Sequence, residues 1–217
     1  FADAAPDVIL TQGLCEVCAL DYDAVVTASA ALEHQPKIVS LNPHSLQEIL
    51  DDIRRVGDIT GRSRAAAALV GDLRQRIEQV GGRAPDRLPR VVCLEWFEPL
   101  YTAGHWVPEM VALAGGHDVI GRAGEPSEKI AWQQVVNAQP EVILLMPCGF
   151  DARRTVKEAT PLRALPGWDD LPAVRTQRVF ALNGNAYFSR PGPRLVNGLE
   201  ILARIIHPDS VEWSLST

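Results

Sequence analysis

The sequence predicts an α/β fold with parallel sheets, organised around one long helix at residues 58–80. Short apolar runs of strand length alternate with helical segments on both sides of that helix. This alternation is typical of parallel sheets with right-handed crossovers. The helix then either joins two α/β lobes or lies on the surface of one large α/β domain, and the pattern alone leaves both open.

The central helix, DITGRSRAAAALVGDLRQRIEQV, begins near Thr60 or Ser63, either of which can cap its first turn through a side-chain oxygen. Apolar side chains recur at steps of three and four residues and define one face. Gly81 and Gly82 end the helix, and Pro85 follows. The predicted face consists of Leu69, Val70, Leu73, Ile77 and Val80.

The segment before the central helix contains two predicted strands and two predicted helices. The runs DVIL and KIVSL have the apolar, β-branched composition of buried parallel strands. Ser45 begins the second helix as its cap, and Glu48 three residues later completes a capping box. The predicted elements are a strand at 7–10, a helix at 21–32, a strand at 37–41 and a helix at 45–56.

The segment after the central helix repeats the alternation. Three apolar runs, RVVCL, EVILLM and RVFAL, predict buried strands. Gly115 and Gly116 end one helix, whereas Pro161 and Pro166 interrupt another. The predicted elements are strands at 90–94, 141–146 and 178–182, and helices at 107–114, 131–138, 155–165 and 195–206.

The composition is that of an ordinary globular protein and argues against several classes of partner. Of 217 residues, 47% are hydrophobic and 22% charged, and the net charge is −6 from 21 basic and 27 acidic residues. Because no basic stripe occurs, nucleic acid and anionic membranes are poor partners. No apolar run reaches the length of about 20 residues that a membrane span needs. The chain begins without Met, and we expect further sequence ahead of Phe1.

The loops that follow the strands are the candidate site, because ligands of open α/β sheets bind outside the carboxyl ends of the strands. Clustered aromatic rings in two of these loops suit a broad, flat and largely apolar ligand, with polar contacts from His105 and Arg190. Large aromatic side chains are mostly buried, so we expect about half of the rings to fill the core. The loops are residues 11–18, 95–106, 147–155 and 183–194, and the rings are Trp96, Phe97, Tyr101, Trp106, Tyr187 and Phe188.

Cys15 and Cys18 form a C-x-x-C pair, which is compatible with a redox site or with half of a zinc site. A structural zinc site needs about four ligands, and the sequence has no second pair. Two neutral thiols in a packed loop is the favoured interpretation, and an intracellular redox or metal protein stays open as the competing class. No HExxH, GxSxG or Walker A sequence occurs, so we predict neither an enzyme nor a metal site.

Several segments together resemble the cobalamin-binding subgroup of the periplasmic solute-binding proteins that serve ABC importers. The resemblance extends over nearly the whole chain, and GHWVPE and YFSRPGPRL are its most specific parts. The wider family also includes siderophore, haem and some metal-ion binders. The matching segments are PDVILTQGLCEVC, KIVSLNPHSLQEIL, RRVGDITGR, CLEWFEPLYTAGHWVPEMVALAGG, VILLMPCGFD and GNAYFSRPGPRLVNGLEILARIIHP.

The resemblance implies two α/β lobes joined by one long backbone helix, with the ligand held in a cleft between the lobes. It assigns residues 1–57 to the amino-terminal lobe, 58–82 to the connecting helix and 83–217 to the carboxy-terminal lobe. Relatives have a further strand, a proline-rich turn and more strands ahead of PDVIL. We therefore expect the first lobe to be incomplete in this chain.

The same resemblance implies a non-enzymatic protein that captures a corrinoid, a vitamin B12-like ligand, outside the cytoplasm and delivers it to an ABC importer. It implies no cofactor, since cobalamin is the transported ligand. A siderophore or haem binder of the same fold is the alternative, for which Arg153, Arg154, Arg190 and Arg194 would supply positive charge. The implied ligand contacts are Gln12, Trp96, Tyr101, Tyr187, Phe188 and Arg190, to which the loop pattern adds His105 and Trp106.

The resemblance also implies that carboxylates on the surface of this protein dock it to its importer. In this family an acidic residue on the outer face of each lobe pairs with arginines of the importer. The corresponding candidates are Glu16 in the first lobe, and Glu125 and Glu128 of GEPSEK in the second. Exposed carboxylates suit this role because complementary charge steers and orients a transient complex.

Overall fold

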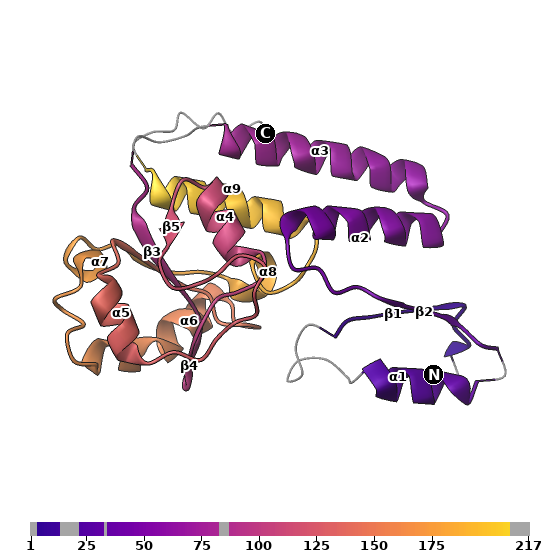
Figure 1. Cartoon of the computed structure of the whole chain (residues 1–217), viewed down its shortest axis with the longest axis horizontal. Helices are drawn as coiled ribbons and strands as arrows, with labels where there is room; N and C mark the ends of the chain where they lie inside the picture. The colour runs from indigo at the N-terminus through magenta and orange to yellow at the C-terminus, as the bar shows by residue number, and fades with distance from the viewer. Residues whose placement is uncertain (1–3, 14–21, 33, 83–86, 209–217) are drawn as a thin grey trace. The chain divides into compact units, whose positions relative to one another are not determined.

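The chain forms two compact units in a computed structural model that describes residues 4–13, 22–32, 34–82 and 87–208. The first unit comprises residues 1–43 and the second comprises residues 44–217 (Figure 1). Strands and helices alternate in both units, so the predicted α/β class is confirmed. The division into segments 1–57, 58–82 and 83–217 stays a prediction.

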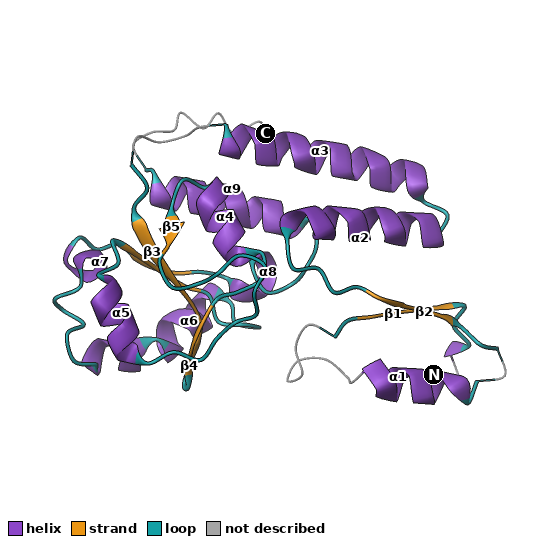
Figure 2. Cartoon of the chain, in the orientation of Figure 1, coloured by secondary structure: helices purple, strands orange, loops and turns teal. Residues whose placement is uncertain are grey.

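The first unit is a β-α-β motif with parallel strands. β1 (Val8–Thr11) and β2 (Lys37–Ser40) pair with Ile9 opposite Ile38, and α1 (Tyr22–Ala30) lies between them in sequence (Figure 2). The two strands and the helix predicted for this segment are therefore confirmed, each with its ends within two residues of the prediction.

Two helices occupy the central region of the chain. α2 (Leu46–Ile59) and α3 (Ser63–Gly81) are joined by a short turn in which Gly61 has φ +68°, a conformation that favours glycine. They pack side by side as a helical hairpin (Figure 1). The helix predicted at 58–80 is thus corrected at its start, because its first two residues belong to α2.

The two helices begin in different ways. Ser45 caps α2 as predicted, since its Oγ accepts a hydrogen bond from the backbone N–H of Glu48 (3.2 Å). The Glu48 carboxylate accepts from the backbone N–H one residue before Ser45 (2.6 Å), rather than from Ser45 itself as in a capping box. α3 begins after Arg62 without a side-chain cap, so the prediction that Thr60 or Ser63 caps it is wrong.

The apolar face of α3 packs against α2 and α9 (Arg194–Ile206). Its buried contacts form a small cluster that consists of Leu50, Val70, Leu73 and Val196. Leu69 was predicted for this face but is 38% exposed. Leu69 lies at the edge of the apolar face of α3, where neighbouring helices do not cover its side chain fully.

An ion pair fixes α3 to α9. The Arg76 guanidinium donates to both carboxylate oxygens of Glu200, with Nε–Oε1 at 2.8 Å and Nη2–Oε2 at 2.9 Å. Both side chains are largely buried. Two parallel charge-assisted hydrogen bonds are stronger than neutral ones and define one relative orientation, so this pair holds the two helices in register.

The second unit is built on a five-stranded sheet in the order β4-β3-β6-β7, with β5 beside the start of β3. β3, β5, β6 and β7 are parallel and β4 is antiparallel. The carboxyl ends of β3, β6 and β7 therefore meet at one edge. The strands are β3 (Arg90–Phe97), β4 (Leu100–Thr102), β5 (His117–Asp118), β6 (Val142–Leu145) and β7 (Val179–Ala181).

The loop predicted at 95–106 is partly a β-hairpin. β3 continues three residues past its predicted end and returns as β4, which pairs with Leu94 and the residues beyond it. β5 was likewise not predicted. These short strands are held by pairing with β3 and leave only a weak local signal in the sequence.

Helices cover both faces of the sheet. α4 and α9 lie on one face, and α5, α7 and a 3₁₀ helix, η2, supply the core on the other (Figure 1). The helix predicted at 155–165 is divided, because α6 ends before Thr160 and η2 follows with Pro161 in its first turn. The remaining helices are α4 (Val107–Leu113), α5 (Trp132–Ala138), α6 (Ala152–Glu158), η2 (Thr160–Ala164), α7 (Pro172–Arg175) and α8 (Gly184–Tyr187).

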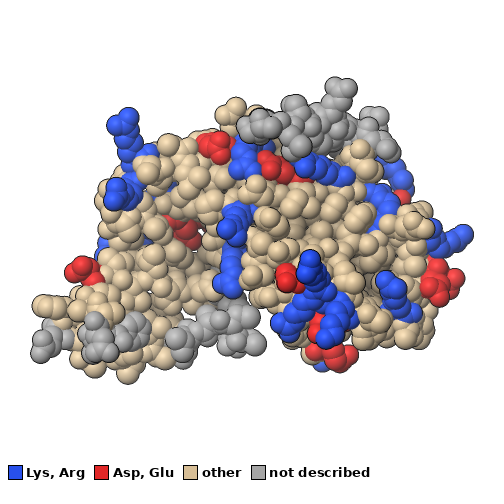
Figure 3. Space-filling view, turned by 180° about the vertical axis from the view of Figure 1, so that it is seen from behind, with Lys and Arg blue, Asp and Glu red and all other residues tan. Residues whose placement is uncertain are grey.

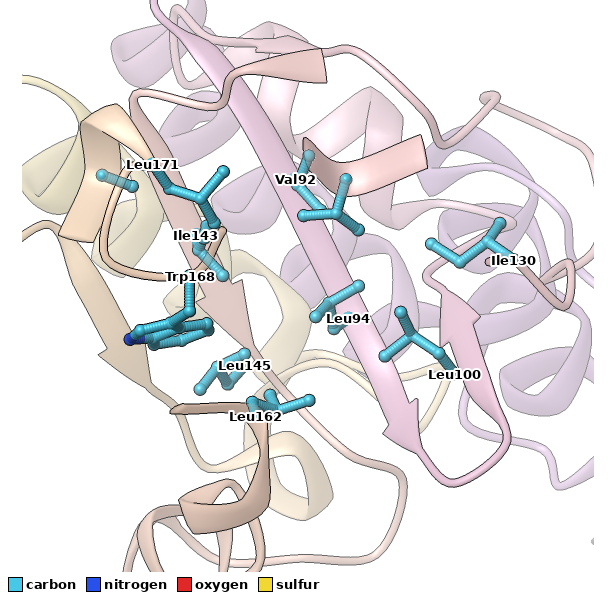
Figure 4. Close-up of a cluster of buried hydrophobic side chains, with 11 residues drawn as sticks. Val92, Leu94, Leu100, Ile130, Ile143, Leu145, Leu162, Trp168 and Leu171 are labelled. Atoms are coloured by element: carbon cyan, nitrogen blue, oxygen red, sulfur yellow. The ribbon is translucent and has the colours of Figure 1, made fainter. Parts of the chain in front are cut away.

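A continuous hydrophobic core supports the sheet. Val92 and Leu94 project from β3 toward Leu162, Trp168 and Leu171, as Figure 4 shows. Cys93, the residue between them in β3, points to the opposite face of the sheet, which α4 and α9 cover, because side chains alternate across a strand. With both faces covered, β6 and residues 91–94 of β3 are buried and support the loops at their carboxyl ends.

Charged side chains are distributed over the surface without a continuous patch of one sign on the face shown in Figure 3. Lys and Arg are the more prominent charged residues on this face, with Asp and Glu among them. Across the described residues, no helix has the length and apolar character required to cross a membrane.

Candidate ligand-binding site

Three of the four predicted loops meet at the carboxyl edge of the second sheet. The loop after β6 bonds to the end of β3 through Cys148 N–H and Glu95 O (3.1 Å), and to α8 through Asn185 N–H and Phe150 O (3.0 Å). Their common position follows from the parallel order of β3, β6 and β7. The fourth loop follows β1 in the first unit, and residues 14–18 of it lie outside the described residues.

An exposed aromatic surface lies on the β3–β4 hairpin. Trp96 is 38% exposed and stands directly opposite Tyr101, so both side chains project from the same face. Phe150 packs behind Trp96 in an edge-to-face contact with ring centroids 5.3 Å apart, and the Arg154 guanidinium lies 3.6 Å from the centre of the Phe150 ring. We call Trp96 and Tyr101, backed by Phe150, the aromatic surface.

A cavity of about 350 Å³ opens beside Trp96. Apolar side chains from the hairpin, the loop after β6 and η2 form most of its wall, and Glu98 and Glu158 also line it. Concave, mainly apolar sites of this size hold part of a small organic ligand. The cavity and the aromatic surface are therefore the best candidate ligand contacts in the second unit.

Two of the predicted ligand contacts are core residues. Trp106 is 5% and Phe188 2% exposed, and the indole Nε1–H of Trp106 donates to the backbone oxygen of Phe188 (2.8 Å). A buried indole normally pairs its N–H in this way. About half of the six loop rings were expected to fill the core. These two do, Phe97 packs against the core while partly buried, and contact of Trp106 and Phe188 with a ligand stays a prediction.

Tyr187 and Arg190 lie at the α8 end of the same edge. Asn183 caps α8 by accepting from Ala186 N–H (2.9 Å), which fixes the position of Tyr187 at the last helical residue. Tyr187 is half-buried and Arg190 is exposed. The Arg190 Nε donates to Asn185 Oδ1 (3.1 Å), so its guanidinium is oriented by α8.

His105 occupies a left-handed backbone conformation, with φ +53°. Its N–H donates to Glu125 O (2.6 Å), and its carbonyl accepts from Gly124 N–H (2.9 Å). Its ring centroid lies 5.4 Å from that of His44 and 5.7 Å from that of Trp106. Burial, and after it the neighbouring His44, lower the pKa of His105, so this imidazole is neutral at neutral pH.

The loop that carries the predicted docking residues is fixed to the hairpin. Glu125 and Glu128 are exposed, and the backbone oxygen of Glu128 accepts from Thr102 N–H (3.0 Å). Glu95 joins the two segments beneath them: burial raises the pKa of its carboxyl, and hydrogen bonds from Ser127 and Gly104 oppose that rise. The carboxylates are thus presented from a rigid loop.

Four other predicted residues belong to the first unit. Gln12 follows β1 in the first unit and is half-buried, and Cys15, Glu16 and Cys18 lie outside the described residues. The described part of the chain holds no group of three or more side chains arranged to bind a metal ion. Phe150 and His44 were missed as neighbours of the site, although Phe150 stands in the predicted loop 147–155.

A sequence-family model described as "Periplasmic binding protein" matches residues 2–186. The vitamin B12-binding protein of Vibrio cholerae is 27% identical over 160 residues, which cover 72% of this chain and 54% of that protein. The cobalamin-binding protein of Halobacterium salinarum is 26% identical over 175 residues, covering 77% of this chain and 46% of that protein. The chain thus spans about half the length of these curated relatives.

Solved structures agree on the fold. An ABC transporter substrate-binding protein from Listeria monocytogenes has a TM-score of 0.79 at 20% identity, over 94% of this chain and 78% of that chain. A periplasmic haem-binding protein from Roseiflexus has a TM-score of 0.73 at 23% identity, over 94% of this chain and 76% of that chain. At these identities the similarity shows the fold alone.

Proposed function

Because the chain belongs to the periplasmic binding protein family, we propose that it captures a small-molecule ligand outside the cytoplasm for an ABC importer, and that this ligand is a corrinoid. The family description supports a binding protein rather than an enzyme. The sequence relatives whose names specify vitamin B12 or cobalamin support the corrinoid.

The observation that carries the proposal is the aromatic surface at the carboxyl edge of the sheet. A corrinoid is broad and largely apolar with a rim of uncharged amides, so it needs a wide aromatic contact and few charged partners. Trp96 and Tyr101 offer such a contact on one face of the hairpin, and the adjoining cavity accepts a projecting group of the ligand. Tyr187 and Arg190 would complete the contact from α8.

The charges around the cavity favour a ligand without carboxylates. Glu98 and Glu158 line the cavity, and Arg154 is engaged with the Phe150 ring. An anionic siderophore or the propionates of haem would meet unfavourable charge there. Haem binding remains the alternative, because solved structures of this fold include haem-binding proteins and Arg190 is exposed.

Replacement of Trp96 by Ala should weaken corrinoid binding by roughly 30-fold, which corresponds to about 2 kcal/mol for an aromatic contact at the centre of a binding surface. The measurement is a calorimetric titration of the protein with cyanocobalamin. Trp132→Phe is the matched control, since Trp132 stacks on Trp168 in the core region with centroids 5.9 Å apart.

A thermal-shift screen with cyanocobalamin, haemin and a ferric siderophore separates the proposed ligand from its alternatives. A ligand at 100 times its dissociation constant adds about 2.7 kcal/mol of stability. If haemin is the one ligand of the three that stabilises the protein, the proposed ligand becomes haem instead of a corrinoid. If no ligand stabilises the protein, the corrinoid proposal fails.

Charge reversal at the proposed docking residues should reduce transport without affecting ligand binding. Glu128→Arg places a positive charge on an exposed, rigid loop, where it would repel arginines of an importer subunit. Combined with Glu16→Arg, the loss of transport in a reconstituted importer should be larger. Glu78→Arg, on the exposed side of α3, is the control. Normal transport by the double variant would exclude these carboxylates as the docking pair.

The redox or metal alternative rests on Cys15 and Cys18, whose thiols can be tested directly. Of the two cysteines within the described residues, Cys93 is buried and Cys148 exposed, and both are free. Burial raises the pKa of the Cys93 thiol well above its usual value, so Cys93 is unreactive. Unchanged ligand binding in the Cys15→Ser, Cys18→Ser double variant would support the transport function over the alternative.

A further inference from the structure

The pairing of His44 with His105 is not accounted for by the proposed transport function. His44 immediately precedes the Ser45 cap of α2, and His105 immediately precedes Trp106 and α4, 61 positions later in the sequence. The fold nevertheless brings their rings to a centroid separation of 5.4 Å, with an angle of 43° between the ring planes. His44 is exposed and His105 half-buried, so both residues are accessible to solvent.

The separation of the rings suits two imidazoles on one metal ion. Zinc–imidazole bonds are about 2.0–2.1 Å long, so two imidazoles at a tetrahedral angle on one ion have ring centroids roughly 5 Å apart. The left-handed backbone at His105, φ +53°, is rare for a residue other than glycine and is held by two hydrogen bonds to the loop at 124–125. In this conformation the ring centroid of His105 lies 5.4 Å from that of His44.

Two carboxylates hydrogen-bond to the backbone of residues 44 and 46, and their negative charge favours a cation at the histidine pair. The Glu48 carboxylate accepts a hydrogen bond from the backbone N–H of His44 (2.6 Å). The Glu109 carboxylate accepts from the backbone N–H of Leu46 (2.8 Å). A cation near the start of α2 would otherwise be disfavoured by the helix dipole, and these charges offset that effect.

We propose that His44 and His105 bind a divalent transition-metal ion through their ring nitrogens, with water in the remaining coordination positions. Imidazole ligands suit Cu²⁺, Zn²⁺ and Ni²⁺, and Cu²⁺ binds most tightly of these to a given nitrogen site. The described residues supply no third ligand at this place, so the site is open and exchanges its ion readily.

The test uses Cu²⁺ and Zn²⁺ with the full chain in a Cys15→Ser, Cys18→Ser, Cys148→Ser background, because Cys148 is free and exposed and none of these thiols should bind the metal. Calorimetry at neutral pH should find one site. His44→Ala and His105→Gly should each weaken binding by at least about tenfold, because each removes one of two nitrogen ligands. Glycine is chosen at residue 105 because it adopts a positive φ without strain. His34→Ala, an exposed histidine in the first unit, should leave the affinity unchanged.

The copper EPR spectrum provides a readout that does not depend on affinity. The parent protein should show hyperfine structure from two imidazole nitrogens, and each single variant should show that of one. A parent protein that binds no ion, or a His44→Ala variant that binds like the parent, would overturn the proposal and leave an aromatic contact between two histidines. If the chain with its cysteines intact binds the metal and the cysteine-replaced chain does not, the metal belongs to the cysteines instead.

Discussion

Replacement of Trp106 by Ala should destabilise the protein by about 3–5 kcal/mol, the usual cost of removing a buried tryptophan. The side chain is 5% exposed, and its indole Nε1–H donates a hydrogen bond to the backbone oxygen of Phe188, 82 residues away in the sequence. The variant loses the packing volume and leaves the Phe188 carbonyl buried without this donor. Since typical domains are stable by only 5–15 kcal/mol, a large shift of the urea midpoint, followed by circular dichroism, is expected.

Two further variants separate packing from hydrogen bonding and from ligand contact. Trp106→Phe keeps most of the ring volume and loses the N–H, so it should cost about 1–3 kcal/mol. Trp96→Ala, in the same loop but 38% exposed, should change stability by about 1 kcal/mol or less. If Trp106→Ala instead unfolds like the parent and loses only ligand binding, Trp106 is a surface contact and its assignment to the core is wrong.

The contrast between Trp96 and Trp106 shows what the sequence can reveal about this site. Both rings were predicted from one loop, and the choice of that loop depended only on its place after a strand. Which ring faces solvent depends on partners far along the chain, namely Phe188 for Trp106 and Phe150 for Trp96. Local sequence carries no information on these pairings, which is why the loops were predicted better than the roles of their residues.

The same reasoning applies to the elements of the fold. β6 was predicted because all of its residues are buried, which leaves a continuous apolar run in the sequence. α2 was predicted because Ser45 caps it through local contacts. β4, β5, α7 and α8 were missed, since each has four residues or fewer and depends on tertiary contacts. The start of α3 was misplaced because the helical pattern continues through the turn at Gly61, whose positive φ the pattern does not reveal.

Replacement of Gly184 by Ala is the second change expected to destabilise the protein strongly, because the added methyl group would push apart the loops after β6 and β7. A Cβ at Gly184 would lie 2.3 Å from the backbone oxygen of Pro147 and 2.7 Å from that of Met146. These are backbone atoms of the loop after β6, so no side-chain rotation relieves the overlap. Overpacking of this kind costs about 1–3 kcal/mol and occasionally more, and we expect about 3 kcal/mol here.

The same substitution at Gly71 should have the opposite sign and serves as the control. Gly71 lies on the exposed side of α3, where an added Cβ meets no atom within 4 Å, so Gly71→Ala should stabilise the protein by about 0.5–1 kcal/mol through helix propensity. Gly184→Ala should also displace Tyr187 at the end of α8 and weaken corrinoid binding, whereas Gly71→Ala should leave binding intact. Urea unfolding and a cyanocobalamin titration of both variants measure the two effects. If Gly184→Ala were as stable as the parent, the loops after β6 and β7 would not be packed as tightly as the distances at Gly184 require.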